Sequence, residues 1–269
     1  MTVRELIRRF RAAGIPEAEY EARRLFAAYS DAPESERFLG TAQTDSPALT
    51  AAAERRLSGE PLAYILGNWD FYRENYLVSP ACLIPRQDTE VLVDYAVGHL
   101  PPGAEFLDLC TGSGCIALSV LAHTENTRAC AADLSETALA LAGKNARRLG
   151  LSERVRFLRS DVLRDTVPGT YDAILSNPPY VDNAVYPTLQ KEISFEPAMA
   201  FLGGADGMDF YRAILPHYKN SLRPGGFFAF EIGYDQGERM SALARAAGFA
   251  AQILPDLGGN DRVAVLTLM

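Results

Sequence analysis

From about residue 105 onward, short apolar runs alternate along the chain with stretches of helical periodicity. This alternation predicts an α/β, Rossmann-like fold with a mainly parallel sheet, because parallel strands are joined by helical crossovers that cover both faces. The expected strands are Glu105–Leu109, Arg128–Asp133, Val155–Ser160, Tyr171–Ser176, Phe227–Ile232, Ala251–Leu254 and Val263–Leu268. The expected helices are Thr89–Gly98, Cys115–His123, Glu136–Leu149, Met208–Asn220 and Gly237–Ala247. No helix separates the last two strands, so we expect them to form an antiparallel pair at the sheet edge.

The first 65 residues form a separate helical pattern. Thr2 and Glu5 fit a capping box, and apolar residues from Val3 to Phe10 share one helical face. Two more helices are expected at about 17–29 and 47–57, followed by a β-hairpin of Trp69–Tyr72 and Tyr76–Val78. We therefore predict a small helical bundle over 1–65, a hairpin linker over 66–80 and a catalytic domain over 81–269. The bundle is either a structural cap or a platform that docks a substrate protein.

Composition excludes several classes of protein. The chain has 269 residues and a net charge of −8, and residues 1–78 hold 10 basic and 12 acidic side chains, so neither part is basic. This argues against tight binding to nucleic acid. No apolar run approaches the ~20 residues of a membrane span. The four cysteines lack CxxC spacing and there are three histidines, so we expect no metal site. Free cysteines suit a reducing cytoplasm, where we expect the protein to be located. We also expect a monomer.

A glycine-rich turn joins the first expected strand of the sheet to a helix, within Asp108–Ala117. Gly112 and Gly114 let the backbone turn sharply and approach a ligand closely. We expect a nucleotide cofactor to contact this turn and the residues around it, namely Asp108, Cys110, Thr111, Gly112, Ser113 and Gly114.

Acidic residues follow the next two strands. Asp133 ends one strand, where its carboxylate can accept both ribose hydroxyls, and Asp161 ends the next, with Val162 placed to pack beside the base. Helix capping or solvent exposure is the alternative role for both carboxylates. NAD and S-adenosyl-L-methionine both fit this pattern. Asp108, close to a cationic methionine moiety, favours the sulfonium cofactor.

Asn177, Pro178, Pro179 and Tyr180 follow the fourth strand of the sheet. Pro178 holds Asn177 out of the α region, and neither proline has an N–H to donate. The corner therefore offers carbonyl oxygens beside an amide side chain, at the strand end where open α/β sheets bind ligands. Such acceptors would grip the two hydrogens of a planar NH₂ group, with the ring of Tyr180 packed against it. Hydride transfer would not require them.

With these motifs the chain resembles the release factor glutamine methyltransferases, from about Ala63 to its end. Leu83–Glu90 is similar to that family's Ile-Pro-Arg-x-(Asp/Glu)-Thr-Glu block, and Asn177–Tyr180 matches its catalytic tetrapeptide. Cys110 stands where the family usually has Gly, and would cost about 1 kcal/mol if positive φ is needed there. Further matching blocks are Glu196–Pro197, Gly203–Gly207, Glu231–Gly233 and Asp261–Val263.

The resemblance implies a class I S-adenosylmethionine-dependent methyltransferase sheet. It also implies methyl transfer to the side-chain amide nitrogen of a glutamine, in the Gly-Gly-Gln loop of class 1 peptide chain release factors. A sister family modifies a ribosomal protein, but the block that contains Arg86 and Thr89 favours the release factor branch. That block suggests that both residues line the mouth of the cofactor pocket. A surface ion pair for Arg86 and a helix cap for Thr89 are the alternatives.

Three other functions remain open from the sequence. A nucleic-acid amino methyltransferase would share the tetrapeptide and cofactor, but should add a basic face. A non-catalytic cofactor-binding or translation-associated interaction protein would be indicated by loss of Asn177 or Asp133, and both are present. An NAD-dependent oxidoreductase would need nicotinamide binding.

Overall fold

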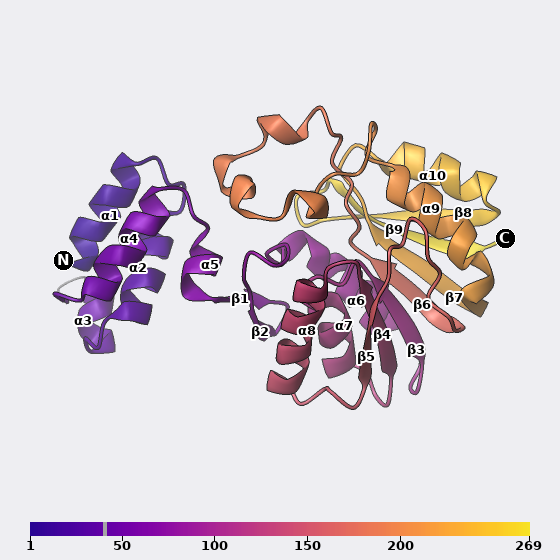
Figure 1. Cartoon of the computed structure of the whole chain (residues 1–269), viewed down its shortest axis with the longest axis horizontal. Coiled ribbons are helices and arrows are strands. Elements are labelled where there is room, and N and C mark those ends of the chain that lie inside the picture. Colours follow the sequence, from indigo (N-terminus) through magenta and orange to yellow (C-terminus); the bar gives the residue numbers. More distant parts are fainter. Residues whose placement is uncertain (40–41) are drawn as a thin grey trace. The chain divides into compact units, whose positions relative to one another are not determined.

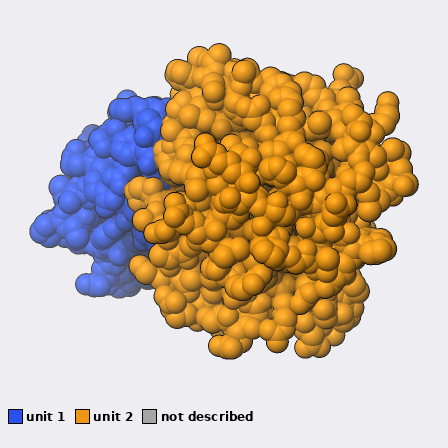
Figure 2. Space-filling model, turned by 45° about the vertical axis from the view of Figure 1, so that its right-hand side comes forward, with its two compact units in different colours: residues 1–68, 190–195 blue, residues 69–189, 196–269 orange. Residues whose placement is uncertain are grey.

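The computed structural model describes residues 1–39 and 42–269 (Figure 1). The chain divides into two compact units, coloured separately in Figure 2. One unit consists of residues 1–68 together with 190–195, and the other of 69–189 and 196–269. The inclusion of 190–195 in the first unit has no counterpart in the sequence pattern, since this segment lies more than a hundred residues beyond the bundle.

The N-terminal unit is helical in its main part. Its helices are α1 (Val3–Ala12), α2 (Ala18–Tyr29), α3 (Glu34–Leu39), α4 (Pro47–Leu57) and α5 (Leu62–Leu66). Thr2 Oγ1 accepts a hydrogen bond of 3.1 Å from the Glu5 amide, which confirms the predicted N-cap of the first helix. The two shortest helices, α3 and α5, were not predicted, because five or six residues are too few to show a periodic pattern.

A buried arginine joins the segment 190–195 to this unit. Arg56 is only 4% exposed and forms ion pairs with Glu21 and with Glu192. Glu192 lies in the 3₁₀ helix η3 (Lys191–Phe195), and its Oε1 is 3.1 Å from Arg56 Nη2. A buried guanidinium needs such partners, because an unpaired charge away from water is costly.

The hairpin β1 (Asn68–Phe71) and β2 (Glu74–Leu77), which starts at the last residue of the first unit's segment 1–68, leads into the second unit and its seven-stranded sheet. The strand order is β5-β4-β3-β6-β7-β9-β8. The first five strands in that order are parallel. β9 pairs antiparallel with β8, as predicted for the sheet edge, and also with β7. The strands are β3 (Glu105–Leu109), β4 (Arg128–Asp133), β5 (Val155–Arg159), β6 (Tyr171–Ser176), β7 (Leu222–Glu231), β8 (Phe249–Pro255) and β9 (Asp261–Leu268).

Four strands, β5, β7, β8 and β9, depart from their predicted bounds, and β7 departs most. β7 begins at Leu222, five residues before the expected start, and includes Pro224, Gly225 and Gly226. These residues usually interrupt strands. Here the register with β6 shifts between the pairs Tyr171–Leu222 and Ala173–Phe227, so the strand continues through a bulge.

Helices cover both faces of the sheet, as the alternating pattern predicted (Figure 1). On β7, Phe227 and Ala229 belong to one apolar core, whereas Phe228 and Phe230 belong to the other. The first core includes residues of α6 (Glu90–His99) and α7 (Cys115–Ala122), and α8 (Glu136–Arg148) contributes Ala146. The second includes residues of α9 (Asp209–Tyr218) and α10 (Gly237–Ala246). Within the described part of the chain, no helix has the length and apolar character needed to cross a membrane.

The strand order places a topological switch point between β3 and β6. From β3 the chain proceeds through β4 to β5 on one side, and it later returns to β6 and β7 on the other. Loops that leave the carboxyl ends of β3 and β6 therefore diverge, and a crevice opens between them. The glycine-rich turn follows β3, and Asn177 follows β6.

Candidate functional site

A cavity of about 480 Å³ lies at the carboxyl ends of the central strands, within the range of small-ligand sites. The cavity lies entirely in the second unit, since its lining residues fall within 81–163, 177–183 and 197–210. Of the residues predicted to form the site, it is lined by Arg86, Thr89, Cys110, Thr111, Gly112, Ser113, Asp133, Asp161, Val162, Asn177 and Pro179.

The turn after β3 needs left-handed backbone at three positions. Gly112 has a φ of 55° and Gly114 a φ of 82°, whereas Cys110 adopts 60° with a side chain present. The position where the family usually has Gly is therefore left-handed, as the sequence suggested, and Cys110 carries the strain. Gly114 lies outside the cavity lining and is the N-cap residue of α7, and a Cβ there would lie 3.1 Å from Ala142 Cβ.

Asp108 lies beneath this turn and not in the cavity lining. It is fully buried, and its Oδ2 accepts hydrogen bonds from Thr111 Oγ1 at 2.5 Å and from the Ala117 amide at 3.2 Å. Burial raises the pKa of the Asp108 carboxyl to about 7. The contacts thus show a role in holding the turn, and direct contact with a cofactor stays a prediction.

Asp133 lines the cavity, and its hydrogen bonds go to backbone amides of the chain itself; ribose binding stays a prediction. Its Oδ2 accepts a hydrogen bond from the Gly112 amide and its Oδ1 one from the Ser135 amide, both at 2.8 Å. Ser135 caps α8, so the carboxylate braces a helix start as well as the glycine turn. Burial raises the pKa of Asp133.

The neighbouring strand end offers apolar surface. Val162 is 4% exposed, while Leu134 and Leu163 are exposed and line the same cavity. Asp161 accepts a hydrogen bond of 3.1 Å from the Leu163 amide. A flat base could pack between such side chains, with carboxylates at its polar edge.

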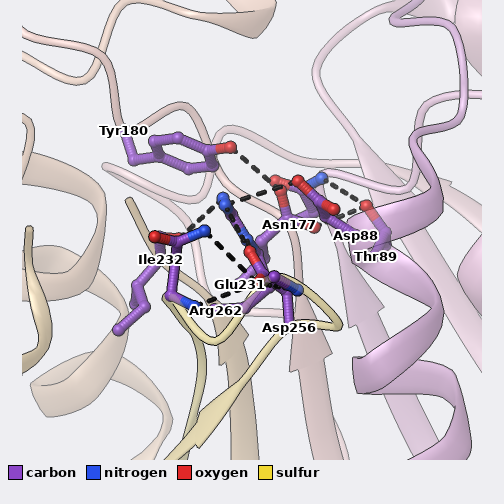
Figure 3. A network of polar contacts seen from close by, with 10 residues as sticks. Asp88, Thr89, Asn177, Tyr180, Glu231, Ile232, Asp256 and Arg262 are labelled. Carbon is purple, nitrogen blue, oxygen red and sulfur yellow. Dashed lines mark hydrogen bonds and ion pairs between the residues drawn. The ribbon is translucent and has the colours of Figure 1, made fainter. Parts of the chain in front are cut away.

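The tetrapeptide corner is divided between the cavity and the protein interior. Asn177 and Pro179 line the cavity, whereas Pro178 is buried outside the lining. Asn177 Nδ2 donates a 3.2 Å hydrogen bond to Thr89 Oγ1, and no described residue donates to Asn177 Oδ1. Tyr180 donates a 2.9 Å hydrogen bond to Glu231 Oε1 (Figure 3). Packing of the Tyr180 ring against a substrate amide stays a prediction.

Glycines of the later block explain how this corner is held. A Cβ on Gly203 would lie 2.7 Å from Tyr180 Cα, so only glycine lets the two backbones approach. The Gln236 side chain donates hydrogen bonds to the carbonyls of Tyr180 and Gly207, at 3.1 and 3.2 Å. In the sequence these glycines were visible only as a matching block, without these contacts.

Two buried glutamates of the matching blocks, Glu196 and Glu231, make contacts that the sequence did not predict. Glu196 pairs with Arg86 and accepts a 2.9 Å hydrogen bond from the Ile84 amide. Glu231 accepts from Thr89 Oγ1 at 2.5 Å, so Thr89 lies at the start of α6 without capping it through its side chain. The sequence did offer a signal for Glu231, which directly follows the apolar run 227–230 and so was expected to be buried. A buried carboxylate requires a hydrogen-bond or ion-pair partner.

Comparisons with known proteins agree with this architecture. The model of the PrmC N-terminal domain matches residues 2–67, and that of the Methyltransferase small domain matches 88–203. A methyltransferase from Pyrococcus furiosus has a similar structure, with a TM-score of 0.54 and 20% identity over 71% of this chain and 86% of that chain. At this identity the likeness shows the fold alone, which is that of class I methyltransferases.

Two curated relatives align with almost the whole chain. The release factor glutamine methyltransferase of Moorella thermoacetica is 40% identical over 96% of this chain and 94% of its own. That of Cereibacter sphaeroides is 39% identical over 97% and 95%. Because such similarity extends over both units, this chain belongs to the release factor glutamine methyltransferase family.

Proposed function

We propose that this enzyme transfers a methyl group from S-adenosyl-L-methionine to the side-chain amide nitrogen of a glutamine, the one in the Gly-Gly-Gln loop of class 1 release factors. One observation carries the proposal. Asn177 lines the cavity with its amide nitrogen engaged by Thr89, while its Oδ1 accepts nothing from the described residues. An acceptor oxygen is thus available for a substrate N–H.

The donor set of the cavity fits the proposed cofactor. The Asp133 carboxylate suits ribose hydroxyls, and Leu134, Val162 and Leu163 provide apolar surface for adenine. The turn containing Gly112 brings backbone close to the cavity without side-chain bulk. When bound, S-adenosylmethionine supplies an electrophilic methyl group on a sulfonium centre.

The corner at Asn177 performs the positioning. An amide nitrogen is a poor nucleophile because its lone pair is delocalised into the carbonyl. We propose that Asn177 Oδ1 and the Pro178 carbonyl accept its two hydrogens and hold the nitrogen for in-line attack. Positioning of this kind contributes up to ~7–11 kcal/mol. The same oxygens stabilise the positive charge that develops on the nitrogen as it gains the methyl group.

The chain's histidines have no place in this reaction. His99, His123 and His217 all lie outside the cavity lining, and Glu74 holds His123 at 2.7 Å. Alkylation makes the two nitrogen protons acidic, so the loss of one to solvent needs no histidine base. We further propose that the N-terminal unit docks the release factor, since the PrmC N-terminal domain model covers almost all of it.

Mass spectrometry tests the proposed reaction. The purified protein and labelled S-adenosylmethionine are incubated in three separate reactions with a class 1 release factor, with RNA or with DNA. The expected result is a gain of one methyl group, mapped to the Gly-Gly-Gln glutamine side chain, with no label in the nucleic acids. A methylated nucleic acid with an unmodified release factor would overturn the proposal.

A further inference from the structure

We propose that Thr89 and the buried Glu231 act as positioning residues that fix which end of the Asn177 side-chain amide faces the substrate. The inference rests on the proposed function, because it assigns a role in presenting the acceptor oxygen. Figure 3 shows the contacts among Thr89, Asn177, Tyr180 and Glu231.

The direction of hydrogen bonding begins at Glu231. Its side chain comes from the end of β7 and is 1% exposed. One carboxylate oxygen accepts from Thr89 Oγ1 at 2.5 Å and the other from the Tyr180 hydroxyl at 2.9 Å. A carboxylate that accepts at both oxygens has no proton to return.

Opposing influences act on the protonation of Glu231, and its two hydrogen-bond donors favour the ionised form. Burial raises the pKa of Glu231, and the hydrogen bonds from Thr89 and Tyr180, together with the charge of Arg262, oppose the rise. Burial and the nearby Glu231 carboxylate raise the pKa of Tyr180, so the phenol keeps its proton and donates it. Arg262 is in turn held by Asp256 at 3.0 Å and Asp88 at 3.3 Å.

The constraint then passes to Asn177. A threonine hydroxyl has one proton, and here Glu231 receives it, so Thr89 Oγ1 can only accept from its other neighbour. That neighbour is Asn177 Nδ2, at 3.2 Å. Asn177 must therefore direct its NH₂ group toward Thr89 and leave Oδ1 for the cavity. In the reversed orientation, Asn177 would direct its own NH₂ group at the substrate NH₂ group, and neither group could accept a hydrogen bond from the other.

Loss of the threonine hydroxyl removes the constraint while preserving shape. Thr89→Val should lower kcat roughly 10- to 100-fold, less than complete removal of a transition-state partner, because part of the population keeps the productive amide orientation. Affinity for S-adenosylhomocysteine and the KM for release factor should stay near wild type. Thr89→Ser restores the hydroxyl and should recover most of the rate. Glu231→Gln should also lower kcat although Thr89 is unchanged. The side-chain NH₂ group of the introduced glutamine can donate to Thr89, which leaves the threonine hydroxyl free to donate to Asn177.

A matched control separates this role from general destabilisation. Ser119 is also fully buried, and its hydroxyl donates to the Glu74 carboxylate at 2.9 Å, outside the cavity lining. Ser119→Ala should keep the wild-type kcat even if its unfolding midpoint falls as far as that of Thr89→Val.

A spectroscopic measurement tests the orientation without turnover. In ligand-free protein labelled with nitrogen-15, the Asn177 side-chain NH₂ signals are those lost in Asn177→Asp. They should shift and exchange faster with solvent in Thr89→Val but not in Thr89→Ser. Unchanged signals, a wild-type kcat in Thr89→Val or Glu231→Gln, or a Thr89→Ser enzyme as slow as Thr89→Val would each overturn the inference. If wild-type enzyme leaves the release factor unmethylated, the proposed function fails, and the NH₂ signals still decide the orientation.

Discussion

The backbone amide of Gly112 donates a 2.8 Å hydrogen bond to Asp133 Oδ2, which ties the turn after β3 to the end of β4. The two residues are 21 positions apart, yet one carboxylate braces the turn and also lines the cavity. The shape of the turn and the polarity of the cavity therefore depend on the same side chain.

Asp133→Ala should weaken S-adenosylhomocysteine binding by about 10- to 100-fold, because one or two hydrogen bonds to a charged acceptor are lost. Isothermal titration calorimetry measures this change. Asp235→Ala removes an exposed carboxylate and serves as the control. Equal affinities for Asp133→Ala and wild type would contradict a ligand role for this residue.

Asn177→Ala should reduce methyl transfer by about 100-fold or more, since it removes a transition-state acceptor. S-adenosylhomocysteine affinity should change only several-fold. Asn177→Asp keeps an acceptor and adds a negative charge beside the expected cation, so cofactor binding should hold or tighten while transfer falls. Titration calorimetry alongside radiolabelled methyl transfer separates the two effects, with the exposed Asn220→Ala as control. Normal turnover in Asn177→Ala would rule out the clamp.

Cys110→Gly should be more stable than Cys110→Ala by about 1 kcal/mol, because only the glycine accepts a φ of 60° without strain. Both variants lose the thiol, so their difference isolates the backbone. Urea unfolding of the ligand-free variants, analysed at equal m-values, gives the comparison. Equal midpoints would mean that the turn relaxes around a Cβ.

The pKa of about 7 for Asp108 predicts a pH-dependent stability in the ligand-free protein. Because the folded value is above the unfolded one, the carboxyl's contribution is full below about pH 4 and is lost as the pH rises through 7. Between about pH 5 and about pH 8, wild type should lose about 3 kcal/mol relative to Asp108→Asn, which does not titrate. Urea unfolding at a series of pH values measures the difference. Parallel curves for the two proteins would place the Asp108 pKa outside this range.

Much of the fold could be predicted because its signals are local. β3, β4 and β6 begin and end where the apolar runs predicted, since buried parallel strands are continuous apolar segments bounded by turn residues. The turn at Gly112 and the corner at Asn177 were likewise readable, because backbone conformation there depends on glycine and proline themselves.

Tertiary structure decided the contacts between distant residues. Thr89 and Glu231 are 142 positions apart, and their hydrogen bond exists only because β7 ends beside the start of α6. The same holds for Glu192, which joins a bundle that ends far earlier in the chain, and for Asp108, whose carboxylate turns under the loop instead of into the cavity. Neighbours along the chain determine which residues form a strand or a turn. Which buried polar groups satisfy one another is determined only when the packed chain brings them together.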